Sequence, residues 1–196
     1  MTKQHINNQL KAGGVGIIPT DTVYGLVGSA LKPKTVARIY RLKRRSPQKP
    51  FIILIASLAD LKKFGLRLTA KEKSWLHKLW PGPVSVILPI ADQGLVKKLA
   101  YLHRGGETLA FRLPNKKWLK TLLRQTGPLI APSANPEGRR PARTISQAKK
   151  YFGQEVDFYL AAGRRLKSWP STLISLVRGK IKLLRRARAT KLDNRE

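Results

Sequence analysis

The sequence contains no cysteine, which excludes disulfide bonds, thiolate metal sites and a cysteine nucleophile. Its three histidines, His5, His77 and His103, are too far apart in the chain to suggest a metal cluster. No apolar run approaches the roughly 18 residues of a transmembrane helix, and the first ten residues lack the apolar stretch of a signal peptide. We therefore expect no protein-bound metal, no membrane contact and a cytoplasmic location.

Acidic residues are also scarce. Ten Asp and Glu oppose 40 Lys and Arg, so the formal net charge is +30, and the basic residues are dispersed along the whole chain. Such a charge attracts polyanions, including nucleotides and RNA. On charge alone, two interpretations stay open: a contact with RNA, or a general adaptation of the chain to a salt-rich or polyanion-rich cytoplasm.

The length of 196 residues suits one domain. Because no shift in composition marks a boundary, we expect a single domain over residues 1–196, with a core at about 14–187 and a frayed tail at 188–196. Predicted strands alternate with helices and one hairpin, which indicates an α/β or α+β fold with a mixed sheet.

The pattern of apolar residues locates the elements. Strands are predicted at 15–19, 51–56, 84–89, 108–113, 129–132 and 158–162, and at 171–177 and 180–184 around a turn at Arg178-Gly179. Helices are predicted at 34–45, 69–79, 118–125 and 144–152. Capping boxes, formed by Thr69 with Glu72 and by Thr144 with Gln147, mark the start of two of these helices.

Two polar segments directly follow predicted strands, where open α/β sheets bind ligands. The first carries Thr20, Asp21 and Thr22, and its spacing alone favours a capped turn over a binding site. In the second, the two-residue period of an extended chain places Ser133 and Asn135 on one side. Both side chains can bond a phosphate or a purine, although a simple polar turn is the alternative.

Basic residues occur at two conspicuous places. Lys43, Arg45 and Lys49 lie between a predicted helix and a buried strand, where they either converge on phosphates or interact with the helix C-terminus. Arg112 interrupts an apolar alternation, and a buried charge of this kind requires a partner, either a bound anion or a carboxylate.

Six segments, taken in chain order, resemble the YrdC/TsaC family of threonylcarbamoyl-AMP synthases over about residues 14–187. They are IIPTDTVYGL, LKRRSPQKPFIILI, WPGPVSVIL, LAFRLP, PLIAPSANPEGRRPART and WPSTLISL. The resemblance implies a twisted, open mixed sheet with flanking helices around a positively charged concave cavity. It also implies an enzyme that forms threonylcarbamoyl-AMP and pyrophosphate from L-threonine, bicarbonate and ATP, with Mg²⁺ held largely by the triphosphate. A downstream transferase complex would then modify adenosine 37 of tRNA.

The resemblance further implies which residues form the site. Those matching the nucleotide-binding positions are Lys43, Arg45, Lys49, Ser133, Asn135 and Arg185, with Lys43 and Arg45 also catalytic. Those matching the threonine end are Thr20, Thr22, Tyr24, Arg112, Ser171 and Thr172, where Arg112 is a candidate for a carboxylate or a phosphate.

The sequence departs from the family pattern in two places. Pro136-Glu137-Gly138 stands where the family usually has a small or apolar residue and Gly, and the segment 162–170 carries extra cations. A competing hypothesis is an RNA-binding or ribosome-maturation protein of the same fold without turnover. The intact combination of Lys43, Arg45, Ser133 and Asn135 favours the enzyme.

Overall fold

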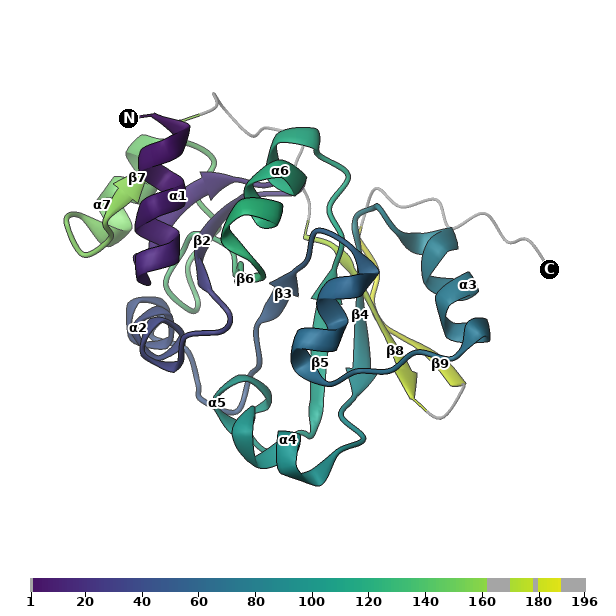
Figure 1. Cartoon of the computed structure of the whole chain (residues 1–196). Helices are drawn as coiled ribbons and strands as arrows, with labels where there is room; N and C mark the ends of the chain where they lie inside the picture. The colour runs from purple at the N-terminus through teal and green to yellow at the C-terminus, as the bar shows by residue number, and fades with distance from the viewer. Residues whose placement is uncertain (1, 162–169, 178–179, 188–196) are drawn as a thin grey trace.

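The computed structural model describes residues 2–161, 170–177 and 180–187 (Figure 1). The described strands form one open mixed sheet in the order β7-β1-β2-β6-β3-β5-β4-β8-β9. Their bounds are β1 (Gly16–Pro19), β2 (Tyr24–Ser29), β3 (Ile52–Leu54), β4 (Val84–Pro89), β5 (Thr108–Arg112), β6 (Leu129–Ile130), β7 (Phe158–Tyr159), β8 (Thr172–Val177) and β9 (Lys180–Arg185). Three neighbouring pairs are parallel, β1 with β7, β3 with β5 and β4 with β8, and the others are antiparallel. The expectation of a mixed sheet is confirmed.

Helices flank this sheet. They are α1 (Lys3–Ala12), α2 (Pro33–Lys43), η1 (Leu58–Phe64, a 3-10 helix), α3 (Ala70–Leu79), α4 (Gln93–Lys98), α5 (Ala100–His103), α6 (Lys117–Thr126) and α7 (Ile145–Phe152). None in the described part of the chain is long and apolar enough to cross a membrane.

The core lies on both faces of the sheet. Consecutive strand residues point to opposite faces, so Ile17 of β1 joins a cluster with α2 and α7, whereas Ile18 joins a cluster with α1 and α6. Figure 1 shows α1 and α6 beside each other over one end of the sheet. The loops that follow β1, α2 and β6 enter the site described below.

Several predicted boundaries need correction. The helix predicted to reach residue 45 ends at Lys43, because Arg44 adopts a left-handed conformation with φ 47°. The strands predicted at 51–56, 129–132 and 158–162 are shorter than expected. The capping box of α3 is confirmed. At α7, one bond of the predicted box is present, since the Gln147 amide donates to Thr144 Oγ1 at 3.1 Å. The return bond differs, because Gln147 Oε1 accepts from the Arg143 amide in place of the Thr144 amide.

The hairpin of β8 and β9 is antiparallel as predicted. Its turn at 178–179 and the tail at 188–196 lie outside the described residues. The structure adds α1, β2, η1, α4 and α5, for which the sequence analysis contained no prediction.

Candidate functional site

A pocket of about 160 Å³ lies where the β1–β2 turn, the loop after α2 and the segment after β6 meet. Residues from both predicted sets line it: Thr20, Thr22, Arg45, Arg112, Ser133, Ser171 and Arg185. The lining includes three arginines and no carboxylate among the described residues. The pocket therefore has the positive character expected of the cavity.

The β1–β2 turn is held by its own hydroxyl groups. Thr20 Oγ1 donates to the Val23 carbonyl at 2.6 Å and accepts from the Thr22 amide at 3.1 Å. The capped turn that the spacing favoured is therefore present. The same two threonines also line the pocket, so the two interpretations of this segment do not exclude each other.

Arg112, at the end of β5, reaches this turn. Its Nη2 forms an ion pair with Asp21 at 2.9 Å, and Nη1 donates to Thr22 Oγ1 at 3.2 Å. Of the two partners left open for Arg112, the structure therefore contains the carboxylate. Burial lowers the pKa of the Arg112 guanidinium, and the negative charge of Asp21 opposes this shift. Its buried Nε has no hydrogen-bond partner among the described residues.

Lys43 lies behind the pocket wall rather than in the lining. It is 2% exposed, and its Nζ donates to the Ser133 carbonyl at 2.8 Å and to the Asn135 side-chain oxygen at 3.3 Å. Burial, with a smaller effect from the charge of Arg45, lowers the pKa of Lys43 to about 8, against a partial opposing effect of Glu137. In this structure Lys43 fixes the backbone that carries Ser133.

The segment after β6 bends where an extended chain was expected. Ser133 pairs with Gly25 of β2, but the Asn135 amide donates back to the Ser133 carbonyl at 2.9 Å. The Asn135 side chain donates to the carbonyls of Pro136 and Arg139 and does not line the pocket. The prediction that the side chains of Ser133 and Asn135 share one side of an extended segment is wrong.

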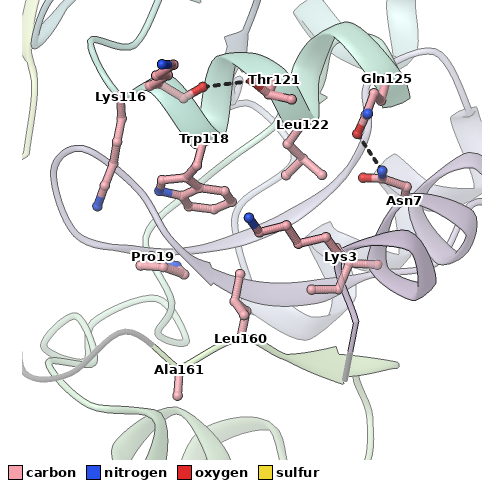
Figure 2. Close-up of a pocket in the computed structure, with 12 residues that line it drawn as sticks. Lys3, Asn7, Pro19, Lys116, Trp118, Thr121, Leu122, Gln125, Leu160 and Ala161 are labelled. Carbon is pink, nitrogen blue, oxygen red and sulfur yellow. Dashed lines mark hydrogen bonds between the residues drawn. The ribbon is translucent and has the colours of Figure 1, made fainter.

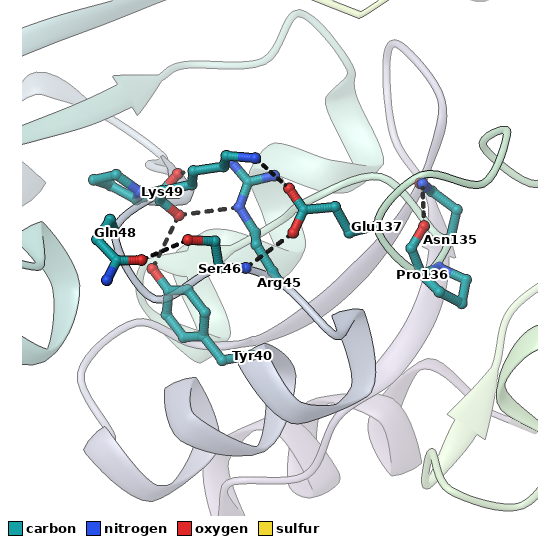
Figure 3. A network of polar contacts seen from close by, with 9 residues as sticks. Tyr40, Arg45, Ser46, Gln48, Lys49, Asn135, Pro136 and Glu137 are labelled. Carbon is teal, nitrogen blue, oxygen red and sulfur yellow. Dashed lines mark hydrogen bonds and ion pairs between the residues drawn. The ribbon is translucent and has the colours of Figure 1, made fainter.

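The loop after α2 is tied to this segment by a network of polar contacts (Figure 3). Arg45 Nε donates to the Lys49 carbonyl at 3.0 Å, and its guanidinium lies 5.3 Å from the centre of the Phe51 ring. Glu137 accepts from the Ser46 amide at 2.9 Å and from Lys49 Nζ at 2.6 Å. These two contacts, with Lys49 first, lower the pKa of Glu137. Lys49 is 59% exposed in its side chain and does not line the pocket.

The remaining predicted residues divide between the pocket and the core. Ser171 accepts from the Arg185 guanidinium through its carbonyl at 3.0 and 3.2 Å, and its hydroxyl lies 2.8 Å from that of Ser85. Burial lowers the pKa of Arg185, and the charge of Arg45 adds to this shift. Tyr24 and Thr172 are fully buried and do not line the pocket.

In the part of the chain that the structure describes, no three His, Asp or Glu side chains group so that they could hold a metal ion. Two carboxylates lie within a few residues of the pocket lining in the sequence, and each forms an ion pair: Asp21 with Arg112 and Glu137 with Lys49.

A second and larger pocket, of about 750 Å³, lies between α1 and α6 (Figure 2). Trp118 points from α6 toward Pro19 and Leu160, while Asn7 Nδ2 donates to Gln125 Oε1 and joins the two helices. Pro19 lines this pocket, and the next residue lines the smaller one. The sequence alone does not indicate this pocket, because α1, which forms one side of it, has no clear apolar period.

Residues 8–187 match the family model described as "Telomere recombination", which covers the Sua5, YciO and YrdC proteins. The chain belongs to the Sua5/YciO/YrdC family. This membership confirms the resemblance stated from the six segments.

Named relatives of this family member cover most of its length. It is 35% identical to the threonylcarbamoyl-AMP synthase of Nitrosococcus oceani over 165 residues. These aligned residues make up 84% of this chain and 87% of the relative. It is 32% identical to the threonylcarbamoyl-AMP synthase of Marinobacter nauticus over 169 residues, and this alignment covers 86% of this chain and 87% of the relative.

Solved structures of the Sua5/YciO/YrdC family share the fold. P. abyssi Sua5 complexed with L-threonine superimposes with a TM-score of 0.84 at 27% identity over 94% of this chain. The match covers 54% of that protein, so this family member spans about half its length. E. coli YciO, at a TM-score of 0.80 and 21% identity, supports the fold alone.

Proposed function

We propose that this protein is a nucleotidyltransferase that forms L-threonylcarbamoyl-AMP and pyrophosphate from L-threonine, bicarbonate and ATP. Relatives that carry the name threonylcarbamoyl-AMP synthase cover most of its length. The structural observation that carries the proposal is the meeting of the two predicted sets in one cationic pocket. Arg45 and Ser133 of the nucleotide set and Thr20, Thr22 and Arg112 of the threonine set all line it.

Threonine is the substrate whose size suits the 160 Å³ pocket. Hydroxyl groups of Thr20 and Thr22 can bond its polar groups, and the Arg112 guanidinium supplies positive charge for its carboxylate. Tyr24, Ser171 and Thr172 would support this end of the pocket, Tyr24 and Thr172 from within the core. P. abyssi Sua5, which superimposes over 94% of this chain, is a structure in complex with L-threonine.

ATP is larger than the pocket, so we propose that it extends from Arg45, Arg185 and Ser133 toward the exposed Lys49. The neutral threonine amine first forms an N–C bond to give a carbamate, either with CO₂, losing a proton to solvent, or with bicarbonate, releasing water. A carbamate oxygen then bonds the α-phosphorus while the bond to the β-phosphate oxygen breaks, and pyrophosphate leaves with that electron pair. Arginines placed around the phosphates neutralise the charge that develops in such a transfer. Mg²⁺ enters this scheme with ATP as part of the substrate.

The remaining nucleotide-set residues act from behind the wall in this proposal. Lys43 and Asn135 hold the backbone on which Ser133 is carried, so their effect on the nucleotide is through the shape of the pocket. A change at Lys43 should therefore lower turnover although its amine lies outside the lining.

The further steps are also proposals. A transferase complex in the cytoplasm would use the product to modify adenosine 37 of tRNA, and the net charge of +30 would favour contact with that RNA. A single domain over residues 1–196 would carry out the adenylation.

Pyrophosphate release from ATP tests the proposal directly. Purified protein should release pyrophosphate only when L-threonine and bicarbonate are both present. Lys43→Ala and Arg45→Ala should each lose most turnover while remaining folded, whereas Lys71→Ala on the exposed face of α3 should not. A double variant of Lys43 and Arg45 with near-normal turnover would contradict the assignment.

The alternative is an RNA-binding protein of the same fold without turnover, which the charge favours. It predicts tight RNA binding that weakens steeply with salt, and no pyrophosphate release from a folded protein. Release that depends on both co-substrates would exclude it.

A further inference from the structure

The loop after α2 concentrates positive charge beside the pocket. Lys43, Arg44, Arg45 and Lys49 lie within seven residues, and the charge of Arg45 contributes to the lowered pKa of Lys43. Like charges at this density repel one another. In the absence of a bound polyanion, a negatively charged group near the loop would offset this repulsion and help to keep Arg45 in the pocket lining.

Glu137 is the acidic residue that contacts this loop. One carboxylate oxygen accepts from the Ser46 amide at 2.9 Å, and the other accepts from Lys49 Nζ at 2.6 Å (Figure 3). Its own amide donates to the Lys43 carbonyl at 2.7 Å. Because Glu137 follows Ser133 by four residues, these contacts join the two segments that contribute Arg45 and Ser133 to the pocket lining.

The position of Arg45 depends on the shape of this loop. Its Nε donates to the Lys49 carbonyl at 3.0 Å, so its guanidinium is held by the backbone of the loop's far end. Glu137 binds the residue directly after Arg45 and the side chain of Lys49. The carboxylate therefore clamps both ends of the segment that orients Arg45.

We propose that Glu137 is a positioning residue, which holds the 45–50 loop against the 133–139 segment so that Arg45 faces the substrate pocket. This inference rests on the proposed function, in which Arg45 binds the phosphates of ATP. It concerns Pro136-Glu137-Gly138, one of the two segments at which a departure from the family pattern is expected from the sequence.

An opposite role for the same contacts is that Glu137 occupies the place of a phosphate and competes with ATP for Lys49. Two observations favour positioning. The carboxylate binds a backbone amide in addition to the lysine, and neither Ser46, Lys49 nor Glu137 lines the pocket. Glu137 therefore acts on the loop from outside the pocket that Arg45 lines.

The two roles predict opposite changes in ATP affinity. Loss of a hydrogen bond to a charged group corresponds to about a tenfold change in an equilibrium constant. We expect Glu137→Ala to raise the Kd and KM for ATP about tenfold and also to lower kcat, because a displaced Arg45 no longer neutralises the charge that develops during the transfer. Glu137→Gln should fall between this variant and the wild type, because its amide oxygen still accepts from the Ser46 amide.

The experiment is calorimetric titration with ATP, together with steady-state kinetics of pyrophosphate release. Glu107→Gln, an exposed substitution that changes the net charge by the same amount, is the matched control and should leave both readouts unchanged. Formate added to Glu137→Ala should recover part of the ATP affinity, since it supplies a carboxylate to the vacated contacts. A role limited to general stability would show no recovery. If Glu137→Ala does not fold, the Gln variant carries the test.

Tighter ATP binding by either variant would overturn the inference in favour of competition, and unchanged binding would also overturn it. Weaker binding that formate restores supports it. Because the titration requires no turnover, it separates the two proposals. If the wild type binds ATP, the Glu137 variants bind it more weakly and neither releases pyrophosphate, the positioning role of Glu137 is retained and the synthase activity is refuted.

Discussion

The buried lysine behind the pocket offers a quantitative test. Lys43 is 2% exposed, and burial lowers its pKa from 10.5 to about 8. Below pH 8 both the folded and the unfolded chain carry the proton, and the folded state bears the cost of a desolvated charge. Between pH 8 and 10.5 the unfolded chain binds more protons, so the stability contributed by this group rises with pH.

The expected size follows from the shift. One pKa unit corresponds to 1.36 kcal/mol, so a displacement of this size changes the free energy of unfolding by about 2–3 kcal/mol between pH 7 and pH 10. Lys43→Met removes the titrating group and keeps a side chain of similar length. The stability of the wild type relative to this variant should therefore increase by that amount across the range.

Urea unfolding at several pH values measures this difference. At each pH, the free energy of unfolding of Lys43→Met is subtracted from that of the wild type. This subtraction removes the contributions of the other titrating groups, which lose their positive charge in both proteins as the pH rises. Lys71→Met, at an exposed position of α3, controls for the removal of one cation. A constant difference between the wild type and Lys43→Met from pH 7 to 10 would refute the reasoning that the charge is desolvated.

Two further substitutions test the packing around the site. Asp21→Leu leaves the buried Arg112 without its 2.9 Å ion pair, so we expect a loss of about 3–5 kcal/mol in the free energy of unfolding, measured with urea. A loss below about 1 kcal/mol would contradict the burial of this charge, and Asp21→Asn should be milder because it keeps an acceptor. In β1, a Cβ on Gly16 would lie 2.3 Å from the Phe158 ring; Gly16→Ala should cost about 1–3 kcal/mol, and Phe158→Leu in the same chain should recover part of it. Failure of that second change to recover stability would show that the contact is not the cause.

The sequence was sufficient to predict those elements whose bounds are marked by local residues. The strand predicted at 84–89 is β4 without a change of boundary, because a run between prolines in which Ser85 alone is polar allows few alternatives. The start of α3 followed from Thr69 and Glu72, whose reciprocal hydrogen bonds are local. The parallel pairing of β4 with β8 joins residues far apart in the chain, and no local pattern specifies such a pair.

Elements without such signals were missed. The strand β2 reads YGLVGS and looks like a loop, since glycine weakens a strand. In the fold, Gly28 is required because a Cβ there would lie 2.5 Å from Thr35. The helix α1 is polar along most of its length and buries only Ile6, Asn7 and Leu10, so its apolar period was too weak to recognise.

For the site, the family pattern identified the residues but could not say which of them reach the pocket. Lys43 and Arg45 are two positions apart, yet the left-handed conformation of Arg44 between them directs one into the wall and the other into the lining. The loop that follows Arg44 is held by contacts with the 133–139 segment. Glu137, which makes several of these contacts, appeared in the sequence only as a departure from the family pattern.

The turn between β1 and β2 separates two cavities by the thickness of one backbone. Pro19 lines the apolar pocket of about 750 Å³, and Thr20 lines the cationic one. An apolar compound that fills the larger cavity would contact Pro19, next to Thr20 in the β1–β2 turn, without entering the smaller pocket. For inhibitor discovery, the α1–α6 pocket thus offers a mainly apolar surface, with Lys3, Lys116 and Lys117 among its lining residues, on an otherwise strongly cationic enzyme.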